Sequence, residues 1–233
     1  MPREADADRF GLPVENWMPP AVPDRALRFD GRYVRVEPLA AGRHAAPLHA
    51  AFHGHPGVWD YMPYGPFGSP AAYAAWLRDM EQRADPLFFA LYDKDRGAWG
   101  GVASYLRITP DAGSIEVGHI AYAPRFQRTR AATEAMVLLM GWAFEAGYRR
   151  YEWKCNALNE ASRRAAQRLG FRFEGVFRQA AVVKGRNRDT AWFSIIDTEW
   201  PVLCGAFTRW LDPSNFSPEG RQVLSLAAVT KTN

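Results

Sequence analysis

The residues best suited to chemistry lie in one loop and in the start of the helix that follows it, from Ala123 to Ala135. Three arginines gather there, Arg125, Arg128 and Arg130, directly before a long apolar run. The first N–H groups of a helix have no partner within the helix and carry the positive end of its dipole. Together with the arginines they favour a polyanion, and a phosphate-bearing ligand is the natural candidate. The alternative is an ordinary helix start with solvated arginines.

A second group of potential ligands consists of four histidines: His44, His49, His53 and His55. His49 and His53 share a helix face at i, i+4, a spacing that can hold a metal ion. No cysteine or acidic residue lies close to them in the sequence. We therefore expect no metal site.

Composition narrows the class of protein. The 233 residues, 48% of them hydrophobic, suit one domain of ordinary size with appended arms. The net charge of +4 is mild and the arginines are scattered, so we expect no nucleic-acid partner. Cys155 and Cys204 lie far apart, and no apolar run reaches the roughly 18 residues of a membrane span. We expect a reduced, cytoplasmic setting and no membrane partner.

The elements that position the loop follow from hydrophobic periodicity and turn residues, which predict an α/β fold. Strands are expected at 31–38, 86–92, 99–108, 115–122, 148–156, 171–183 and 189–198, and helices at 41–54, 70–83, 130–146, 160–169 and 199–211. Residues 1–30 are rich in Pro, Asp and Arg and predict an irregular arm. Residues 31–200 form the domain, and 201–233 add a helix and a polar tail.

Two of these elements have faces that can be assigned. On the strand 148–156, the odd-numbered residues from Tyr151 to Cys155 should be buried, and the even-numbered residues from Arg150 to Lys154 should lie on the other face. Asn159 is of a type that caps helices. The inner stripe of the helix behind it is expected to comprise Leu158, Ser162, Ala165 and Leu169.

This order of elements resembles the GNAT acyltransferase superfamily, and most of all its RimJ/RimL branch, the ribosomal-protein N-terminal acetyltransferases. In that family a Gln/Arg-x-x-Gly-x-Gly/Ala segment begins the central helix. Here it falls on Gln127-Arg-Thr-Arg-Ala-Ala132, with Arg130 in place of the central glycine. The segments Thr133-Glu-Ala135, Asn159-Glu-Ala-Ser162, Leu169-Gly-Phe171 and Glu174-Gly-Val-Phe-Arg178 also follow the pattern of the branch.

The resemblance implies a mostly antiparallel mixed sheet of about seven strands, flanked by helices and splayed between strands 4 and 5, here 115–122 and 148–156. It also implies acetyl-CoA as the co-substrate. The pyrophosphate would contact Gln127, Arg128, Thr129, Arg130, Ala131 and Ala132, and the remainder of CoA would contact Ala121, Tyr122, Asn156, Asn159 and Ser162. At Arg130 we expect a helical φ and an outward side chain, since positive φ is unfavourable for a residue with a side chain.

Acetyl transfer to an amine requires a base and an acid. Glu116 is the candidate base, because the branch places an acidic residue two positions before a glycine in the acceptor cleft; the alternative is a half-exposed strand carboxylate. His119 should lie on the opposite face if the strand alternates regularly, as a packing residue. The tyrosine that often serves as the acid falls on Ala166, so Ser162, Asn156 or solvent would have to reprotonate the thiolate.

The predicted function is direct acetyl transfer from acetyl-CoA to a primary amine, on a small molecule or a protein N-terminus, by a monomer or homodimer. Two alternatives stay open: another acyl donor such as succinyl-CoA, and a non-catalytic CoA-binding regulatory module. The aromatic segment Trp59, Tyr61, Met62, Tyr64 and Phe67 either walls the acceptor site, as the equivalent region does in the family, or packs over the sheet.

Overall fold

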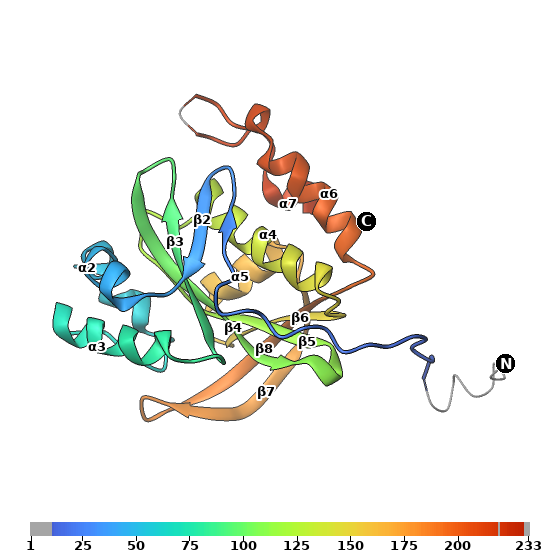
Figure 1. The fold of residues 1–233 in the computed structure, drawn as a ribbon, viewed down its shortest axis with the longest axis horizontal. Helices are drawn as coiled ribbons and strands as arrows, with labels where there is room; N and C mark the ends of the chain where they lie inside the picture. The colour runs from blue at the N-terminus through green and yellow to red at the C-terminus, as the bar shows by residue number, and fades with distance from the viewer. Residues whose placement is uncertain (1–10, 219, 231–233) are drawn as a thin grey trace.

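The computed structural model describes residues 11–218 and 220–230. The first ten residues of the expected arm and the last three of the expected tail lie outside this range. Eight strands form one sheet in the order β1-β2-β3-β4-β5-β6-β8-β7 (Figure 1). They are β1 (Phe29–Asp30), β2 (Val34–Pro38), β3 (Leu87–Asp93), β4 (Ala98–Thr109), β5 (Ser114–Tyr122), β6 (Arg150–Asn156), β7 (Arg172–Val183) and β8 (Arg186–Ile196). The two-residue β1 is the one strand that the periodicity did not indicate, because two residues are too few to show a period.

The helices are α2 (Ala41–Phe52), α3 (Pro70–Glu81), α4 (Arg130–Glu145), α5 (Glu160–Arg168), α6 (Trp200–Leu211) and α7 (Leu226–Thr230), with the short 3-10 turns η1 (Pro56–Trp59), η2 (Pro110–Ala112) and η3 (Pro213–Asn215). Side chains of Ser69, Thr129 and Asn159 accept the capping hydrogen bonds of α3, α4 and α5. No helix in the described ranges is long and apolar enough to cross a membrane.

The predicted splay of the sheet is confirmed. All neighbouring strands are antiparallel except β5 and β6, which run parallel. These two pair only from Ser114 and Arg150 to Val117 and Trp153. Since β5 continues to Tyr122 and β6 to Asn156, their carboxyl-terminal halves diverge.

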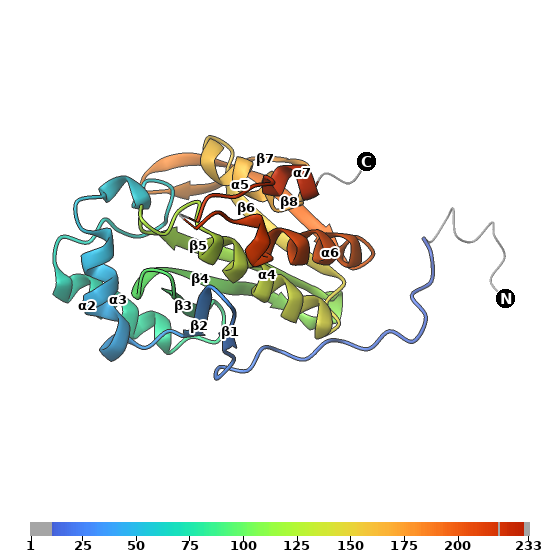
Figure 2. The ribbon, with the colours of Figure 1, turned by 90° about the horizontal axis from the view of Figure 1, so that it is seen from above.

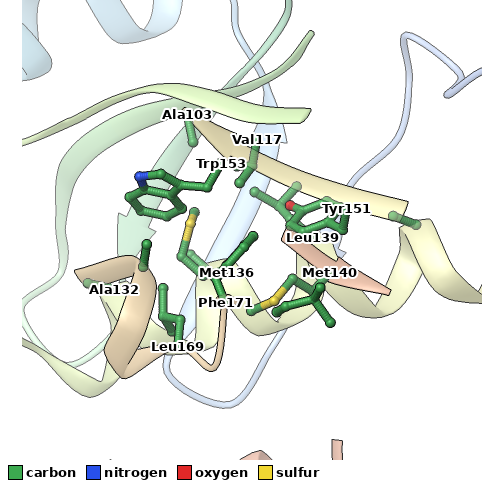
Figure 3. Packing of buried hydrophobic residues seen from close by; sticks show 14 of the residues in the cluster. Ala103, Val117, Ala132, Met136, Leu139, Met140, Tyr151, Trp153, Leu169 and Phe171 are labelled. Atoms are coloured by element: carbon green, nitrogen blue, oxygen red, sulfur yellow. The ribbon is translucent and has the colours of Figure 1, made fainter. Parts of the chain in front are cut away.

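Helices cover both faces of the sheet (Figures 1 and 2). The larger core packs α4 and α5 against one face, where Met136 and Leu139 lie against Tyr151 and Trp153 (Figure 3). The smaller core packs α2 and α3 against the other face, around Phe88 and neighbouring aromatic rings. The face assignment of β6 was correct, since Tyr151, Trp153 and Cys155 are all buried in the larger core.

Glu134 ties helix α4 to the sheet. Its carboxylate, in the interior, accepts backbone hydrogen bonds from Arg32 at 2.9 Å, Tyr33 at 2.6 Å and Val34 at 2.8 Å. A Cβ at Gly31 would approach this carboxylate to 2.6 Å, so a side chain there would displace Glu134 from its three hydrogen bonds. The Glu of the Thr-Glu-Ala segment thus has a structural role.

Two expectations fail. Leu158 is 75% exposed rather than part of an inner stripe, because α5 begins only at Glu160 and leaves Leu158 in the preceding turn. The polar tail contains α7, whose Leu226 is buried and whose Thr230 hydroxyl donates to the carbonyl of Arg168 at 3.1 Å. Five residues are too few for a helical period, so the sequence carried no signal for this helix.

Candidate active site

A β-bulge in β5 shapes the splay. The pairing of β4 with β5 shifts by one residue between Val102 and Ser104, and His119 opposite them has a φ of 50°. Val117 points into the larger core, so Glu116 lies on the opposite face. The ring of His119 contacts Phe88 of the smaller core at 5.2 Å, which places it on the same face as Glu116. The expectation of opposite faces fails because the bulge interrupts the alternation.

Glu116 is buried between two cations. Only 3% of the residue is exposed, which excludes a half-exposed carboxylate. Its Oε2 lies 2.6 Å from Nη1 of Arg107 and 3.0 Å from Nζ of Lys154. Burial raises the pKa of the Glu116 carboxyl, and the charges and hydrogen bonds of Lys154 and Arg107 oppose that rise. The carboxylate is therefore fixed in position and more basic than an ordinary glutamate.

The ion pairs continue across the strands. Lys154 also lies 2.7 Å from Glu152, Arg150 lies 2.7 Å from Glu152, and Arg150 reaches Glu174 at 2.5 Å. The ammonium of Lys154 lies 3.6 Å above the ring of Trp192. The alternation of Arg150, Glu152 and Lys154 indicated one shared face, but their partners on other strands could not be inferred from it.

The aromatic segment crosses the open end of the splay. The Tyr64 hydroxyl lies 3.0 Å from Nδ1 of His119, the Tyr61 hydroxyl donates to the Leu158 carbonyl at 3.2 Å, and Lys184 donates to the Trp59 carbonyl at 2.8 Å. Through these three contacts the aromatic segment joins β5, the β6–α5 turn and the β7–β8 hairpin. Trp59, Tyr64 and Phe67 also pack into the smaller core, so the segment packs over the sheet. Burial lowers the pKa of His119 to about 4, with Arg107 and Arg188 adding to the effect, so the imidazole is neutral near pH 7.

The start of α4 presents unpaired donors. Among the described residues, the backbone N–H groups of residues 128–131 have no hydrogen-bond partner, whereas that of Ala132 donates to the Thr129 hydroxyl at 3.0 Å. Arg128 adopts a φ of 60°. Left-handed backbone at a residue with a side chain is strained, and such strain is concentrated at binding sites. The side chains of Ala131 and Ala132 are buried, so only their backbone faces the loop.

The arginines of the loop differ in their surroundings. Arg130 begins α4 without a positive φ, as expected. Its guanidinium is bound by the carboxylate of Asp95 at 2.7 and 3.0 Å and lies 4.2 Å from the ring centre of Tyr33. Arg125 and Arg128 are exposed and form no ion pair with the described residues. These two remain available for an anion at the helix start.

The end of β5 holds a buried hydroxyl without a partner. Gln127 donates to the Tyr122 carbonyl at 3.0 Å, which shapes the loop. The Tyr122 hydroxyl is buried and has no hydrogen-bond partner in the described chain. Burial lowers the pKa of Arg168, and the charges of Tyr122 and Arg128 also act on it. The sequence did not indicate a role for Arg168, because the helical pattern places this residue on the solvated face.

The residues of the β6–α5 turn are held by one another. Asn156 Oδ1 accepts from the Leu158 N–H at 2.9 Å, and Asn159 Oδ1 accepts from the Ser162 N–H at 3.0 Å. The Ser162 hydroxyl accepts from Trp153 Nε1 at 3.0 Å. Their side chains thus shape the β6–α5 turn, and the Ser162 hydroxyl also interacts with the Cys155 thiol.

Ala166 shows why no tyrosine occupies its position. Its side chain is fully buried in the larger core, where a phenol ring would overpack the interior. An acid at this position is therefore excluded, and another residue or solvent would have to supply the proton.

These features fit a CoA ester. The diverging halves of β5 and β6 leave backbone groups free, with which the amides of a pantetheine arm can pair. The free N–H groups of α4 suit a pyrophosphate. Ala121, whose side chain is buried, contributes only backbone to this edge.

Residues 34–172 match the family described as Acetyltransferase (GNAT) domain. A solved GCN5-related N-acetyltransferase from Brucella melitensis is 46% identical, with 94% of this chain and 100% of that chain covered and a TM-score of 0.91. A probable acetyltransferase of the GNAT family from Chromobacterium violaceum is 42% identical over 82% of this chain and 96% of that one, with a TM-score of 0.76. Microcin C7 self immunity acetyltransferase MccE, solved with acetyl-CoA and AMP, is 20% identical over 71% and 93%, with a TM-score of 0.63, and shares the fold. No curated protein matches the chain.

The family match spans more than half of the chain, and the splayed parallel pair and the free helix start agree with it. The chain belongs to the GNAT N-acetyltransferases.

Proposed function

We propose that the protein transfers an acetyl group from acetyl-CoA directly to a primary amine. The observation that carries the proposal is the arrangement around the splay of β5 and β6. Free backbone donors at the start of α4 lie beyond the end of β5, and the buried Glu116 lies on the same strand, between Arg107 and Lys154. MccE, which has this fold, was solved with acetyl-CoA.

The proposed CoA site comprises the backbone of residues 127–132, with Arg128 and Arg168 adding positive charge. The free strand edges near Tyr122 and Asn156 would pair with the pantetheine amides. Bound acetyl-CoA would supply the acyl carbon and a thiolate leaving group. The chain itself positions that carbon beside the acceptor and excludes water with the aromatic segment.

Glu116 is the proposed base. Its raised pKa suits acceptance of a proton from the acceptor ammonium, directly or through a water. Arg107 and Lys154 hold the carboxylate still, which favours a defined proton path. Transfer is direct, because Cys155 is buried and burial raises the pKa of its thiol, which makes it a poor nucleophile.

Two hydroxyls can reprotonate the thiolate, those of Ser162 and Tyr122. The Tyr122 hydroxyl has no described partner, whereas the Ser162 oxygen already accepts from Trp153. Turnover rates of Ser162→Ala and Tyr122→Phe decide between them and solvent. A fall of kcat in one variant, with KM for acetyl-CoA unchanged, assigns the acid to that residue, and two unchanged rates assign it to solvent.

The motifs from Gln127 to Arg178 support placement in the RimJ/RimL branch, with a small molecule or a protein N-terminus as acceptor, and a monomer or homodimer as the working form. Besides the acceptor, the acyl group also stays open, since another acyl-CoA such as succinyl-CoA would use the same CoA cradle.

Thermal melts with CoA, followed by a transfer assay, test the proposal. A ligand at about 10 to 100 times its dissociation constant should stabilise the fold by roughly 1.4 to 2.7 kcal/mol. CoA release from acetyl-CoA should then depend on an added amine, and succinyl-CoA in parallel identifies the donor. No thermal shift at millimolar CoA would contradict the proposal, as would amine-independent release alone.

A further inference from the structure

The β7–β8 hairpin places a cation without a counter-ion beside the proposed acceptor site. Arg188 of β8 is half-buried and forms no ion pair with any described residue. Its Nε is buried without a hydrogen-bond partner. Removing a guanidinium from water without a partner costs stability. The unpaired burial of Arg188 therefore indicates a binding role for this residue.

A second orphan donor lies on the same face of β8. Every second residue of a strand lies on the same face, so residues 188, 190 and 192 share one side of the sheet. Lys154 lies above the Trp192 ring and also pairs with Glu116, so this is the side that carries Glu116. Nε1 of Trp192 is likewise buried without a partner in the described chain. Two unsatisfied N–H donors, one of them charged, thus face the region of the proposed base.

The nearby carboxylates are already engaged. Asp189 accepts from the Gln179 N–H at 2.7 Å and from Asn187 at 3.0 Å, and Glu116 is paired with Arg107 and Lys154. No carboxylate of the described chain therefore neutralises Arg188.

Arg188 is electrostatically coupled to Glu116 and His119. Burial is the main cause of its lowered pKa, and the charge of Glu116 acts on it as well. Its own charge acts on His119. The tip of the same hairpin is joined to the aromatic segment through Lys184 and Trp59.

The backbone next to Arg188 is hollowed. The β7–β8 ladder is interrupted between Phe177 and Ala181, the partner of Arg188, so residues 178–180 leave the ladder. Phe177, Arg178, Gln179 and Ala180 line an open hollow in this edge strand.

We infer that the acceptor amine carries an anionic group, a carboxylate or a phosphate, which Arg188 binds with help from Trp192. This inference rests on the proposed acetyl transfer and narrows its acceptor to small anionic amines. The anion would satisfy both orphan donors while the amine faces Glu116. Polyamines carry no anion, and a protein N-terminus brings one only where its first side chains are acidic; other acceptors of these kinds would leave Arg188 unpaired.

Matched acceptor pairs test the inference on the full-length protein with acetyl-CoA. The pairs are amino acids against their carboxamides, phosphoethanolamine against ethanolamine, and spermidine as a cationic acceptor. We expect kcat/KM to be at least about tenfold higher for the anionic member of one pair, which also tells carboxylate from phosphate. Equal or higher turnover of the neutral members or of spermidine would overturn the inference.

Arg188→Gln provides the residue test, with Arg186→Gln as the control, since Arg186 is an exposed arginine on the same hairpin. Arg188→Gln should raise KM for the anionic acceptor by about tenfold or more, a rise much larger than any change in KM for acetyl-CoA or in turnover of the neutral partner. Arg186→Gln should behave as wild type, and Trp192→Phe should show a smaller rise. Equal loss on both partners, or a raised KM for acetyl-CoA, would place Arg188 outside acceptor recognition.

Binding experiments distinguish failure of the proposed acetyl transfer from failure of the proposed anion site. Absence of any CoA-dependent thermal shift would contradict acetyl transfer itself. Where CoA binds but no amine of the panel reacts, calorimetry of N-acetylated amino acids, N-acetylphosphoethanolamine and their neutral counterparts on the CoA-loaded protein decides. Equal binding of charged and neutral compounds would contradict the anion site alone.

Discussion

The two sides of the splay between β5 and β6 differ in the groups they present, backbone on one side and side chains on the other. The proposed CoA side uses backbone groups: the free N–H groups at residues 128–131, the diverging edges of β5 and β6, and buried alanines. The proposed acceptor side uses charged and aromatic side chains from β4, β5, β6, β8 and the segment before α3. A shared co-substrate can be bound by backbone geometry, whereas a particular acceptor has to be recognised by side chains.

The difference extends to how each side tolerates change. Backbone donors survive many substitutions as long as the turn and the helix start persist. Buried ion pairs depend on every partner, because removal of one leaves an uncompensated charge. We therefore expect single substitutions to affect the acceptor side most in rate, and the CoA side mostly through stability and affinity.

The largest effect is expected at Glu116. Glu116→Gln should lower kcat by about 10² to 10⁴, because the base is lost, with little change in CoA affinity. The matched control is Glu152→Gln, which removes the other carboxylate beside Lys154. Near-wild-type turnover of Glu116→Gln between pH 6 and 9 would return this carboxylate to a structural role.

The pH profile sharpens the same assignment. A base must be ionised, so activity falls as pH drops through its pKa in the folded enzyme. Since burial raises that pKa, the acid limb of kcat/KM should lie above the ordinary range of glutamate. An acid limb that persists in Glu116→Gln would assign the ionisation to another group.

The next effect concerns the helix that forms the CoA side. Glu134→Ala should reduce the free energy of unfolding by about 3 kcal/mol, because three backbone N–H groups near Arg32 lose their acceptor. Urea unfolding measures it, and Glu145→Ala, at an exposed position of α4, should change little. Comparable losses in the two variants would show that helix propensity, rather than the anchor, is responsible.

A smaller gain is expected at Arg128. Arg128→Gly should raise stability by about 0.5 kcal/mol, because glycine adopts the φ of 60° without strain. The variant should bind CoA less tightly at low salt, since a loop cation is lost. Arg125→Gly tests the same loop at a residue without positive φ and should not stabilise the fold. Loss of stability in Arg128→Gly would refute the strain argument.

The smallest effect concerns Arg130, which Asp95 holds in a bidentate pair. Asp95→Ala should tighten CoA binding at low salt by about 0.3 to 1 kcal/mol, because Arg130 is released and a carboxylate is removed. Arg130→Ala should weaken it by a similar amount, and high salt should remove both effects. Tighter binding of Arg130→Ala at every salt concentration would mean that its side chain obstructs the cradle.

The sequence by itself determined the order of elements and the helix cap at Asn159, and it located the segment that we propose as the CoA cradle. These features are local, because periodicity, capping chemistry and a helix start are all expressed within a few neighbouring residues. The Gln127–Ala132 segment could therefore be located from the chain alone.

Only the tertiary structure decided the acceptor side. The bulge at His119 reverses the expected face, Arg107 and Lys154 meet Glu116 from other strands, and Asp95 captures Arg130. Arg168 and Arg188 read as ordinary surface arginines in the sequence, and their burial arises from packing across the sheet. Contacts between residues far apart in the chain depend on strand register and on one inserted residue, and no local pattern records either.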